Sequence, residues 1–156
     1  MNKQKILTIV FLFAAAIGVL VSSYSTWAHY DPSVHEICSI NDTFNCDIVN
    51  KSVYSEILGV PVALMGLVAY VFFFVGLLVY LRSKNSTLES LLKAGMILGV
   101  LFSLYLTFIE AFVLYTWCIL CLTQQLAIIV MLICMFMLAA SDKVRPVEKQ
   151  ETSTDL

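Results

Sequence analysis

The sequence predicts an all-α integral membrane protein, a four-transmembrane-helix bundle with a partly helical outer loop between the first two helices. Of the 156 residues, 60% are hydrophobic and only 13% are charged, which leaves too few polar side chains to cover a water-soluble domain. Four long stretches are also nearly free of charge, and each is close to the roughly 20 apolar residues that cross a bilayer. The same composition excludes an intrinsically disordered chain, and the net charge of -2 excludes a basic nucleic-acid-binding surface.

The charged residues set the limits of the four predicted spans. The third stretch reaches a spanning length only if Lys93 and Glu110 lie near its two ends, where a lysine can extend its ammonium group to the interface. Pro61 stands in the first turn of the second span, where proline is tolerated. A tight connection around Thr116 makes the last two spans antiparallel neighbours. The spans are expected at about residues 6–28, 59–81, 91–115 and 118–140.

The basic residues predict the orientation, because short loops rich in Lys and Arg stay on the cytoplasmic side of a membrane. We therefore expect a multi-pass protein of the cytoplasmic membrane, with both termini and the 82–93 loop in the cytoplasm. The acidic loop 29–58 and the 115–117 turn would face the periplasm or the cell exterior. Lys51 is the exception to this asymmetry; the other basic residues are Lys3, Lys5, Arg82, Lys84, Lys93, Lys143, Arg145 and Lys149.

One membrane domain is expected over residues 1–141, followed by a polar cytoplasmic tail at 142–156. The first span also fits a secretory signal peptide, with a charged start, an apolar core and Ala28 at a crude cleavage site. Its apolar core is longer than the usual 7–15 residues of a signal peptide, which favours a retained helix. Cleavage would leave the orientation of the later spans unchanged, so both interpretations stay open.

Four of the five cysteines fall on the outer side. Cys38 and Cys46 lie in the outer loop, and Cys118 and Cys121 begin the fourth span. Disulfides persist outside the cytoplasm, so two inert structural bridges are one interpretation. A Cys118–Cys121 bridge, however, would join positions i and i+3 of one helical face and close a loop too short to add much stability. This favours a bridge that opens and closes. Cys134 lies mid-span among apolar residues and is expected to pack as a small hydrophobic side chain.

The start of a helix favours a thiolate, because its free N–H groups and dipole lower the pKa of a thiol there. Cys118 would gain most from this effect, while burial beside Trp117 acts in the opposite direction. A CxxC pair also occurs in metal sites. Seven residues separate Cys38 from Cys46, more than the usual two to four of a zinc site, so no metal is expected.

The second half of the outer loop has an apolar pattern at helical spacing. Val49, Ser52, Val53 and Ile57 fall at positions i, i+3, i+4 and i+8. The pattern predicts a short helix over residues 47–58 that lies at the membrane interface and covers the bundle.

Several motifs occur together. They are Cys-x7-Cys in the outer loop, a serine six residues after the second cysteine, YSEILGVPVALMGLVAY leading into the second span, and IEAFVLYTWCILC leading into the fourth. In these motifs, which cover residues 38–125, the chain resembles the vitamin K epoxide reductase family and is most similar to its bacterial stand-alone members. DsbB-type quinone reductases perform related chemistry, but they carry their CxxC in the first periplasmic loop and match less well.

The resemblance implies a helix bundle around a quinone, menaquinone or ubiquinone, that accepts electrons as a substrate. It implies catalytic roles for four cysteines: Cys38 meets the thiol of a thioredoxin-fold (DsbA-like) partner, Cys46 exchanges with Cys118, and Cys121 faces the quinone. Residues 38–46 would act as a shuttle between these states. Because few residues follow the fourth span, the partner is expected to be a separate protein on the outer side.

Two further residues are candidates for the quinone site. Ser52 matches the serine that the family has near its active centre, where a hydroxyl can bind a quinone carbonyl or a thiolate. A surface role for Ser52 and a choice of Ser55 instead both stay open. Glu110 is expected about 7–8 Å below Tyr115 along the helix, just inside the apolar layer. An ionisable group there indicates a proton relay to the quinone, with a structural role as the alternative.

The predicted function is that of a quinone-dependent, disulfide-generating oxidoreductase that supports disulfide formation in exported proteins. A reductase of vitamin K epoxide and a noncatalytic four-span scaffold stapled by two disulfides are the alternatives. The vitamin K cycle enzymes of animals have an asparagine early in the second span and a tyrosine four residues after the last active cysteine. This chain has Val62 and Gln125 there, which argues against epoxide reduction.

Overall fold

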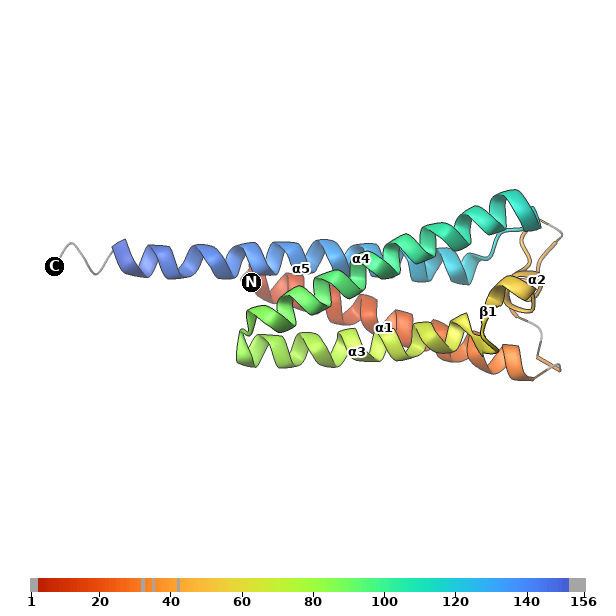
Figure 1. Ribbon diagram of the computed structural model, residues 1–156, viewed down its shortest axis with the longest axis horizontal. Coiled ribbons are helices and arrows are strands. Elements are labelled where there is room, and N and C mark those ends of the chain that lie inside the picture. The colour runs from red at the N-terminus through yellow and green to blue at the C-terminus, as the bar shows by residue number, and fades with distance from the viewer. Residues whose placement is uncertain (1–2, 32, 35, 42, 152–156) are drawn as a thin grey trace.

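The computed structural model describes residues 3–31, 33–34, 36–41 and 43–151, with side chains described as far as residue 141. Four long helices pack side by side along one axis (Figure 1). Each is long and apolar enough to cross a membrane, which confirms the predicted all-α four-helix bundle of a multi-pass membrane protein. The helices are α1 (Lys3–Tyr30), α3 (Val62–Ser83), α4 (Ser86–Ile109, continued by the π-helical turn η2, Glu110–Leu114) and α5 (Ile119–Glu151).

Successive helices alternate in direction along the bundle. The start of α1 and the α3–α4 connection lie at one end, while the outer loop and the α4–α5 connection lie at the other (Figure 1). The helices therefore follow one another in the predicted order. Most of their ends differ from the predicted span boundaries by a few residues.

The loop predicted over residues 82–93 is wrong, because most of this segment is helical. α3 ends at Ser83, with Lys84 in the left-handed conformation at φ 49°, and α4 begins at Ser86 after only two intervening residues. Asn85 caps α4, since its side-chain oxygen accepts a hydrogen bond from the Thr87 N–H at 2.8 Å. A cap of this kind starts a helix directly, so Arg82 lies at the end of α3 and Lys93 within α4.

α1 packs against both α3 and α5. Phe11 and Ala15 on α1 are completely buried in the core. A side chain at Gly18 would collide with the ring of Tyr70 on α3, so glycine permits the close approach of these two helices. The Tyr70 hydroxyl in turn donates a hydrogen bond to the Gln124 carbonyl on α5 at 2.6 Å. The bundle depends on α1, which favours a retained helix over a cleaved signal peptide.

Cys134 belongs to this same core. Its side chain is buried in a cluster with Met131 and Leu138 of α5, apart from the cluster formed by the other cysteines. This burial confirms the predicted packing role.

The outer loop between α1 and α3 is partly helical, as predicted, but it contains several short elements. They are α2 (Cys46–Asn50), the 3₁₀ turn η1 (Val53–Ser55) and an antiparallel hairpin of β1 (Glu56–Ile57) and β2 (Val60–Pro61). The single helix predicted over residues 47–58 is therefore wrong. α2 extends over only the first part of that range.

A tight turn replaces the last part of the predicted helix. Ile57 pairs with Val60, and the two residues between them, Leu58 and Gly59, have φ angles of 53° and 79°. Two successive left-handed residues form the two-residue type I′ turn that matches the twist of a hairpin. The apolar spacing contained no information about this backbone preference.

The middle of the predicted helix is also interrupted. Ser52 is extended, with ψ at 161°, and Val53, which the helical pattern assigned to the apolar face, is 84% exposed. Pro61 ends β2 and directly precedes α3, so it lies just outside the helix and not within its first turn.

α5 continues as a helix to Glu151, beyond the predicted end of the fourth span. The predicted polar tail 142–156 is therefore helical in its first part. Residues 152–156 of that tail, and residue 42 of the predicted shuttle 38–46, lie outside the described residues.

Candidate active site

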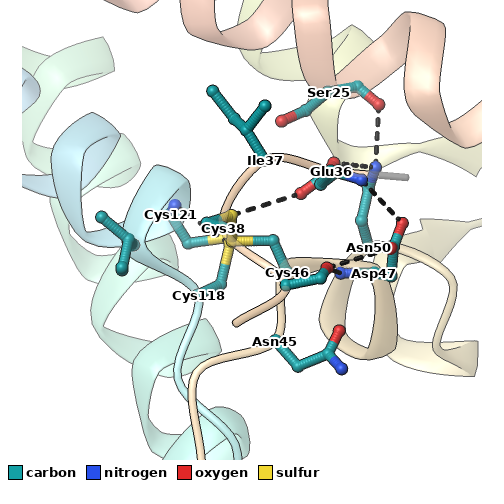
Figure 2. Close-up of a disulfide and its surroundings, with 12 residues drawn as sticks. Ser25, Glu36, Ile37, Cys38, Asn45, Cys46, Asp47, Asn50, Cys118 and Cys121 are labelled. Carbon is teal, nitrogen blue, oxygen red and sulfur yellow. Dashed lines mark hydrogen bonds between the residues drawn. A yellow bond between two sulfur atoms is a disulfide. The ribbon is translucent and has the colours of Figure 1, made fainter. Parts of the chain in front are cut away.

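Four of the five cysteines meet at the outer-loop end of the bundle (Figure 2). Cys38 and Cys46, called here the outer pair, form a disulfide with their Cα atoms 5.6 Å apart. Cys118 and Cys121, the inner pair, are free thiols and pack in one cluster with the disulfide. The structure brings together all four cysteines that the sequence singled out, with the outer pair oxidised and the inner pair reduced.

A short backbone pairing between distant segments holds the two pairs together. The Trp117 N–H donates a hydrogen bond to the Thr43 carbonyl at 2.8 Å, and the Asn45 N–H donates to the Trp117 carbonyl at 3.2 Å. The segments run parallel, so Cys46 and Cys118, which follow them, lie side by side. No sequence motif indicated this pairing.

The sulfur of Cys118 caps α5. It accepts a hydrogen bond from the Cys121 N–H at 3.2 Å, which satisfies one of the free N–H groups of the first helical turn. The sequence predicted that the fourth span begins at Cys118, but α5 begins one residue later, at Ile119. Cys118 is thus the N-cap residue of α5.

Glu110 lies against the inner pair. It is only 1% exposed, and its Oε2 accepts a hydrogen bond from the Cys118 N–H at 3.0 Å. One carboxylate oxygen and the sulfurs of Cys118 and Cys121 all lie within 4.8 Å of one another. Glu110 also begins the π-helical turn η2, and such turns occur frequently at functional sites.

A second buried carboxylate, Glu36, lies against the outer pair. Glu36 is 2% exposed, and its Oε2 lies 3.8 Å from the Cys38 sulfur. Burial raises the pKa of Glu36 to about 7, with Asp47 adding to the rise and the hydrogen bond from Asn50 opposing it. In the sequence Glu36 was one of several acidic residues of the loop. The sequence signal that could have identified Glu36 was its place two residues before a reactive cysteine.

Asn50 is a second residue that the sequence did not indicate. Its side-chain N–H groups donate to the Glu36 carboxylate at 2.7 Å and to the Ser25 carbonyl of α1 at 2.8 Å. The backbone carbonyl of Asn50 accepts a hydrogen bond from His29 Nδ1 at 2.8 Å. Asn50 therefore joins α1, α2 and the cysteine loop, and fixes the position of Glu36 (Figure 2).

A cavity of about 510 Å³ lies beside the inner pair. Its walls come mainly from α3, α4 and α5, and α2 and η1 line its outer side. Mostly apolar walls with a few convergent polar groups are typical of sites for small organic molecules, which have volumes of about 300–1,000 Å³. Among the lining residues are Ser52, Ser55, Glu110, Cys118, Cys121 and Gln125.

A family model described as the vitamin K epoxide reductase family matches residues 9–136. The chain belongs to this family. The matched region contains both cysteine pairs, both buried carboxylates and the residues around the cavity. Among curated proteins, no match to the chain was found.

Membership of the vitamin K epoxide reductase family makes this chain a membrane thiol oxidoreductase. Enzymes of the family use quinone-type substrates and generally work with thioredoxin-like partners. A cavity that touches two free thiols fits such a substrate, because electrons can pass from a sulfur to a ring held against it.

Val62 and Gln125, the two positions at which the sequence predicted a departure from the animal enzymes, both line the cavity. Gln125 Oε1 accepts a hydrogen bond from the Thr107 hydroxyl at 2.7 Å. Gln125 is thus a polar side chain held in the cavity wall, with amide N–H groups able to donate to a ligand.

Ser52 and Ser55 also line the cavity, but their hydroxyls bind the backbone. Ser52 donates to the Val49 carbonyl at 2.8 Å, and Ser55 donates to the Ser52 carbonyl at 2.7 Å. A quinone carbonyl only accepts hydrogen bonds. Either hydroxyl would therefore have to leave its backbone partner before it could donate to a quinone.

Proposed function

We propose that this protein oxidises a thioredoxin-fold (DsbA-like) partner and passes the electrons through its two cysteine pairs to a membrane quinone, menaquinone or ubiquinone. It would thereby support disulfide formation in exported proteins. The observation that carries this proposal is the contact of all four cysteines in one cluster, with the inner pair lining the cavity.

The first exchange consumes the outer disulfide. A thiolate of the partner attacks the Cys38 sulfur, which forms a mixed disulfide with Cys38 and expels the Cys46 thiolate. With the inner pair oxidised, Cys46 then attacks Cys118 and expels the Cys121 thiolate. Thiol–disulfide exchange needs close cysteines, and the packing of Cys46 and Cys118 in one cluster supports this order.

The second exchange restores the outer disulfide. The second thiol of the partner attacks its own mixed disulfide, so the partner leaves oxidised and Cys38 leaves as a thiolate. Cys38 then attacks Cys46, which reforms the outer disulfide and releases Cys118. Two electrons now reside on Cys118 and Cys121, and the quinone takes them with two protons as the inner disulfide forms. With the outer pair oxidised and the inner pair reduced, the protein is in the state that precedes this last step.

The surroundings of Cys38 support a protein partner. Cys38 itself is 6% exposed, whereas Ile37 and Ile40 beside it are strongly exposed. Exposed apolar side chains next to a reactive site are typical of a docking surface. We propose that the partner binds these isoleucines and displaces the loop enough to reach the Cys38 sulfur.

Three polar residues would serve the quinone. Ser52 would exchange its bond to the Val49 carbonyl for one to a quinone carbonyl, and Gln125 on α5 offers a further donor. Glu110 would relay protons from the thiols of the inner pair to the reduced quinone, because its carboxylate lies within 4.8 Å of both sulfurs.

The remaining proposals concern the membrane and metals. The basic residues support a cytoplasmic α3–α4 end and an outer-facing cysteine site in the cytoplasmic membrane. We propose one membrane domain over residues 1–141. We also propose that the site works without a metal, since disulfide exchange needs all four cysteines as sulfur nucleophiles or leaving groups.

The experiment that tests the relay uses the full chain in detergent. Reduced thioredoxin serves as the thiol donor, and the absorbance of menaquinone or ubiquinone reports reduction. We expect turnover in the wild-type protein, none in Cys121→Ala, and wild-type turnover in the matched control Cys134→Ala, which alters a cysteine of the core.

Two results would contradict the proposal. Turnover that persists in Cys121→Ala would remove the inner pair from the path. The absence of turnover with either quinone, together with bridges that resist mild reductant, would leave the disulfide-stapled scaffold. Conversion of vitamin K epoxide by the same preparation would favour the epoxide reductase alternative.

A further inference from the structure

Each cysteine pair has its own buried carboxylate. A carboxylate oxygen of Glu36 lies within 4.8 Å of the Cys38 and Cys46 sulfurs, and an oxygen of Glu110 lies equally close to Cys118 and Cys121. Both carboxylates are almost completely buried. The relay as proposed above gives Glu36 no task, although burial of an acid beside a disulfide carries a free-energy cost.

We propose that Glu36 is the proton carrier of the outer pair, which protonates the Cys38 sulfur when the partner expels it and takes the proton back when Cys38 attacks Cys46. This assignment rests on the proposed relay and adds a catalytic residue to it. In the first step the Glu36 O–H bond breaks and a Cys38 S–H bond forms, while the partner closes its disulfide. In the second step the proton returns to Glu36 as the Cys38–Cys46 bond forms, so Glu36 ends unchanged.

The geometry of Glu36 fits this task. Its Oε2 lies 3.8 Å from the Cys38 sulfur, so a proton can pass directly when the sulfur is freed from its disulfide. Its other oxygen is held by the Asn50 amide at 2.7 Å, and Asn50 is itself anchored to α1 through the Ser25 carbonyl. One oxygen is thus fixed by the protein, and the other faces the reacting sulfur.

The chemistry of Cys38 creates the need for a proton. Cys38 is buried, and a thiolate released in a site with little water is disfavoured. An unprotonated thiolate there would also attack the partner's new disulfide and reverse the reaction. Protonation by Glu36 stabilises the released cysteine and lets the oxidised partner depart.

The charged groups around Glu36 allow it to hold that proton near neutral pH. On the α2 side Asp47 accepts a hydrogen bond from the Glu36 N–H at 3.2 Å, and Lys51 pairs with Asp47 at 3.2 Å. On the α1 side the neutral Ser25 side chain hydrogen-bonds Glu36 and opposes the rise in its pKa, while the ring of His29 is linked to it through Asn50. On the far side of the disulfide lie the inner thiols and Glu110.

No described cation contacts the Glu36 carboxylate directly, so burial dominates and keeps the pKa of Glu36 near 7.

The experiment compares Glu36→Gln with the wild-type protein in the thioredoxin-to-quinone assay. Glutamine keeps the shape of the side chain and an oxygen for the Asn50 amide, but it carries no proton to donate to sulfur. Glu56→Gln is the matched control, because Glu56 is a carboxylate of the same loop that binds His29 at its surface. Alkylation of free thiols verifies that the Cys38–Cys46 disulfide is present in each variant.

We expect turnover in Glu36→Gln to fall by about a hundredfold or more, from the lower end of a general acid–base contribution upward. The mixed disulfide between thioredoxin and Cys38 should accumulate on nonreducing gels, because its resolution is the step that Glu36 assists. The rate change that wild type and Glu56→Gln have around pH 7 should disappear. A residue that only holds the loop would not move this pH profile.

Several outcomes separate the two proposals. Wild-type turnover and pH profile in Glu36→Gln, with Cys38→Ala inactive, would overturn the role of Glu36 and leave the relay intact. Full turnover in Cys38→Ala would overturn the relay itself. If Glu36→Gln fails to form the outer disulfide, Glu36→Asp decides, since it keeps a carboxyl at a greater distance. A slower but still pH-dependent rate in Glu36→Asp supports the proposal, and a rate equal to wild type overturns it.

Discussion

The Cys121 N–H donates a hydrogen bond to the Cys118 sulfur at 3.2 Å, so one cysteine of the inner pair caps the helix that carries the other. The same Cys118 donates its own N–H to the Glu110 carboxylate at 3.0 Å. Cys118 is therefore held from both sides, next to the outer disulfide and at the edge of the cavity. The contacts that orient it for exchange also begin α5.

This relationship predicts different effects for two substitutions of Cys118. Cys118→Ser keeps an N-cap side chain, whereas Cys118→Ala removes it at a cost of about 1 kcal/mol. Both variants should lose quinone reduction, because neither retains the sulfur. Thermal unfolding in detergent should show a lower midpoint for the alanine variant. Equal midpoints for serine and alanine would mean that the cap adds nothing to stability.

The burial of Glu36 predicts a pH-dependent stability. Its carboxyl has a pKa of 4.5 when freely hydrated and about 7 in the folded protein. Below the lower value both states are protonated and the contribution to stability is fully present. It is lost as the pH rises through about 7, and it amounts to roughly 3 kcal/mol. The unfolding midpoint should fall over this range in the wild-type protein and much less in Glu36→Gln. Parallel curves for the two proteins would contradict the assignment.

The proposed contact of Ser52 with the quinone predicts a modest loss of affinity. Removal of one neutral hydrogen bond costs about 1 kcal/mol, so Ser52→Ala should raise the KM for quinone roughly fivefold. The KM for thioredoxin should stay unchanged, since that partner binds on the outer face. Ser55→Ala tests the neighbouring hydroxyl in the same way, and Ser23→Ala, an exposed serine of α1, is the control. If Ser55→Ala raises the KM for quinone more than Ser52→Ala does, Ser55 and not Ser52 contacts the quinone.

The hairpin turn predicts a stabilising substitution. Leu58 has φ at 53° and a completely exposed side chain, so its left-handed backbone is not compensated by packing within the chain. Left-handed conformation costs a residue such as leucine about 1 kcal/mol, and asparagine before glycine is favoured in type I′ turns. Leu58→Asn should therefore raise the unfolding midpoint slightly. Gly59→Ala, which puts a side chain at φ 79°, should lower it.

The four spans could be predicted because a membrane helix satisfies its own backbone hydrogen bonds and needs only a sufficient apolar length. The predicted helix over residues 47–58 failed for the converse reason. In the outer loop Ser52 is extended and Leu58 and Gly59 are left-handed. These backbone conformations interrupt the helix that the apolar spacing predicted. Short apolar runs outside the membrane carry too little information to specify an element.

Composition, charge pattern and cysteine positions were enough to predict the membrane class, the order of the spans and the end of the bundle that carries four cysteines, and the motifs were enough for the family resemblance. The groups that surround those cysteines became known only from the folded bundle. Residues 43–45 pair with Trp117, far along the chain. Glu110 meets Cys118 and Glu36 meets Cys38 because the chain turns back on itself at each place. Apolar length is a local property that each helix carries alone, whereas the environment of a sulfur depends on contacts that exist only after the bundle has assembled.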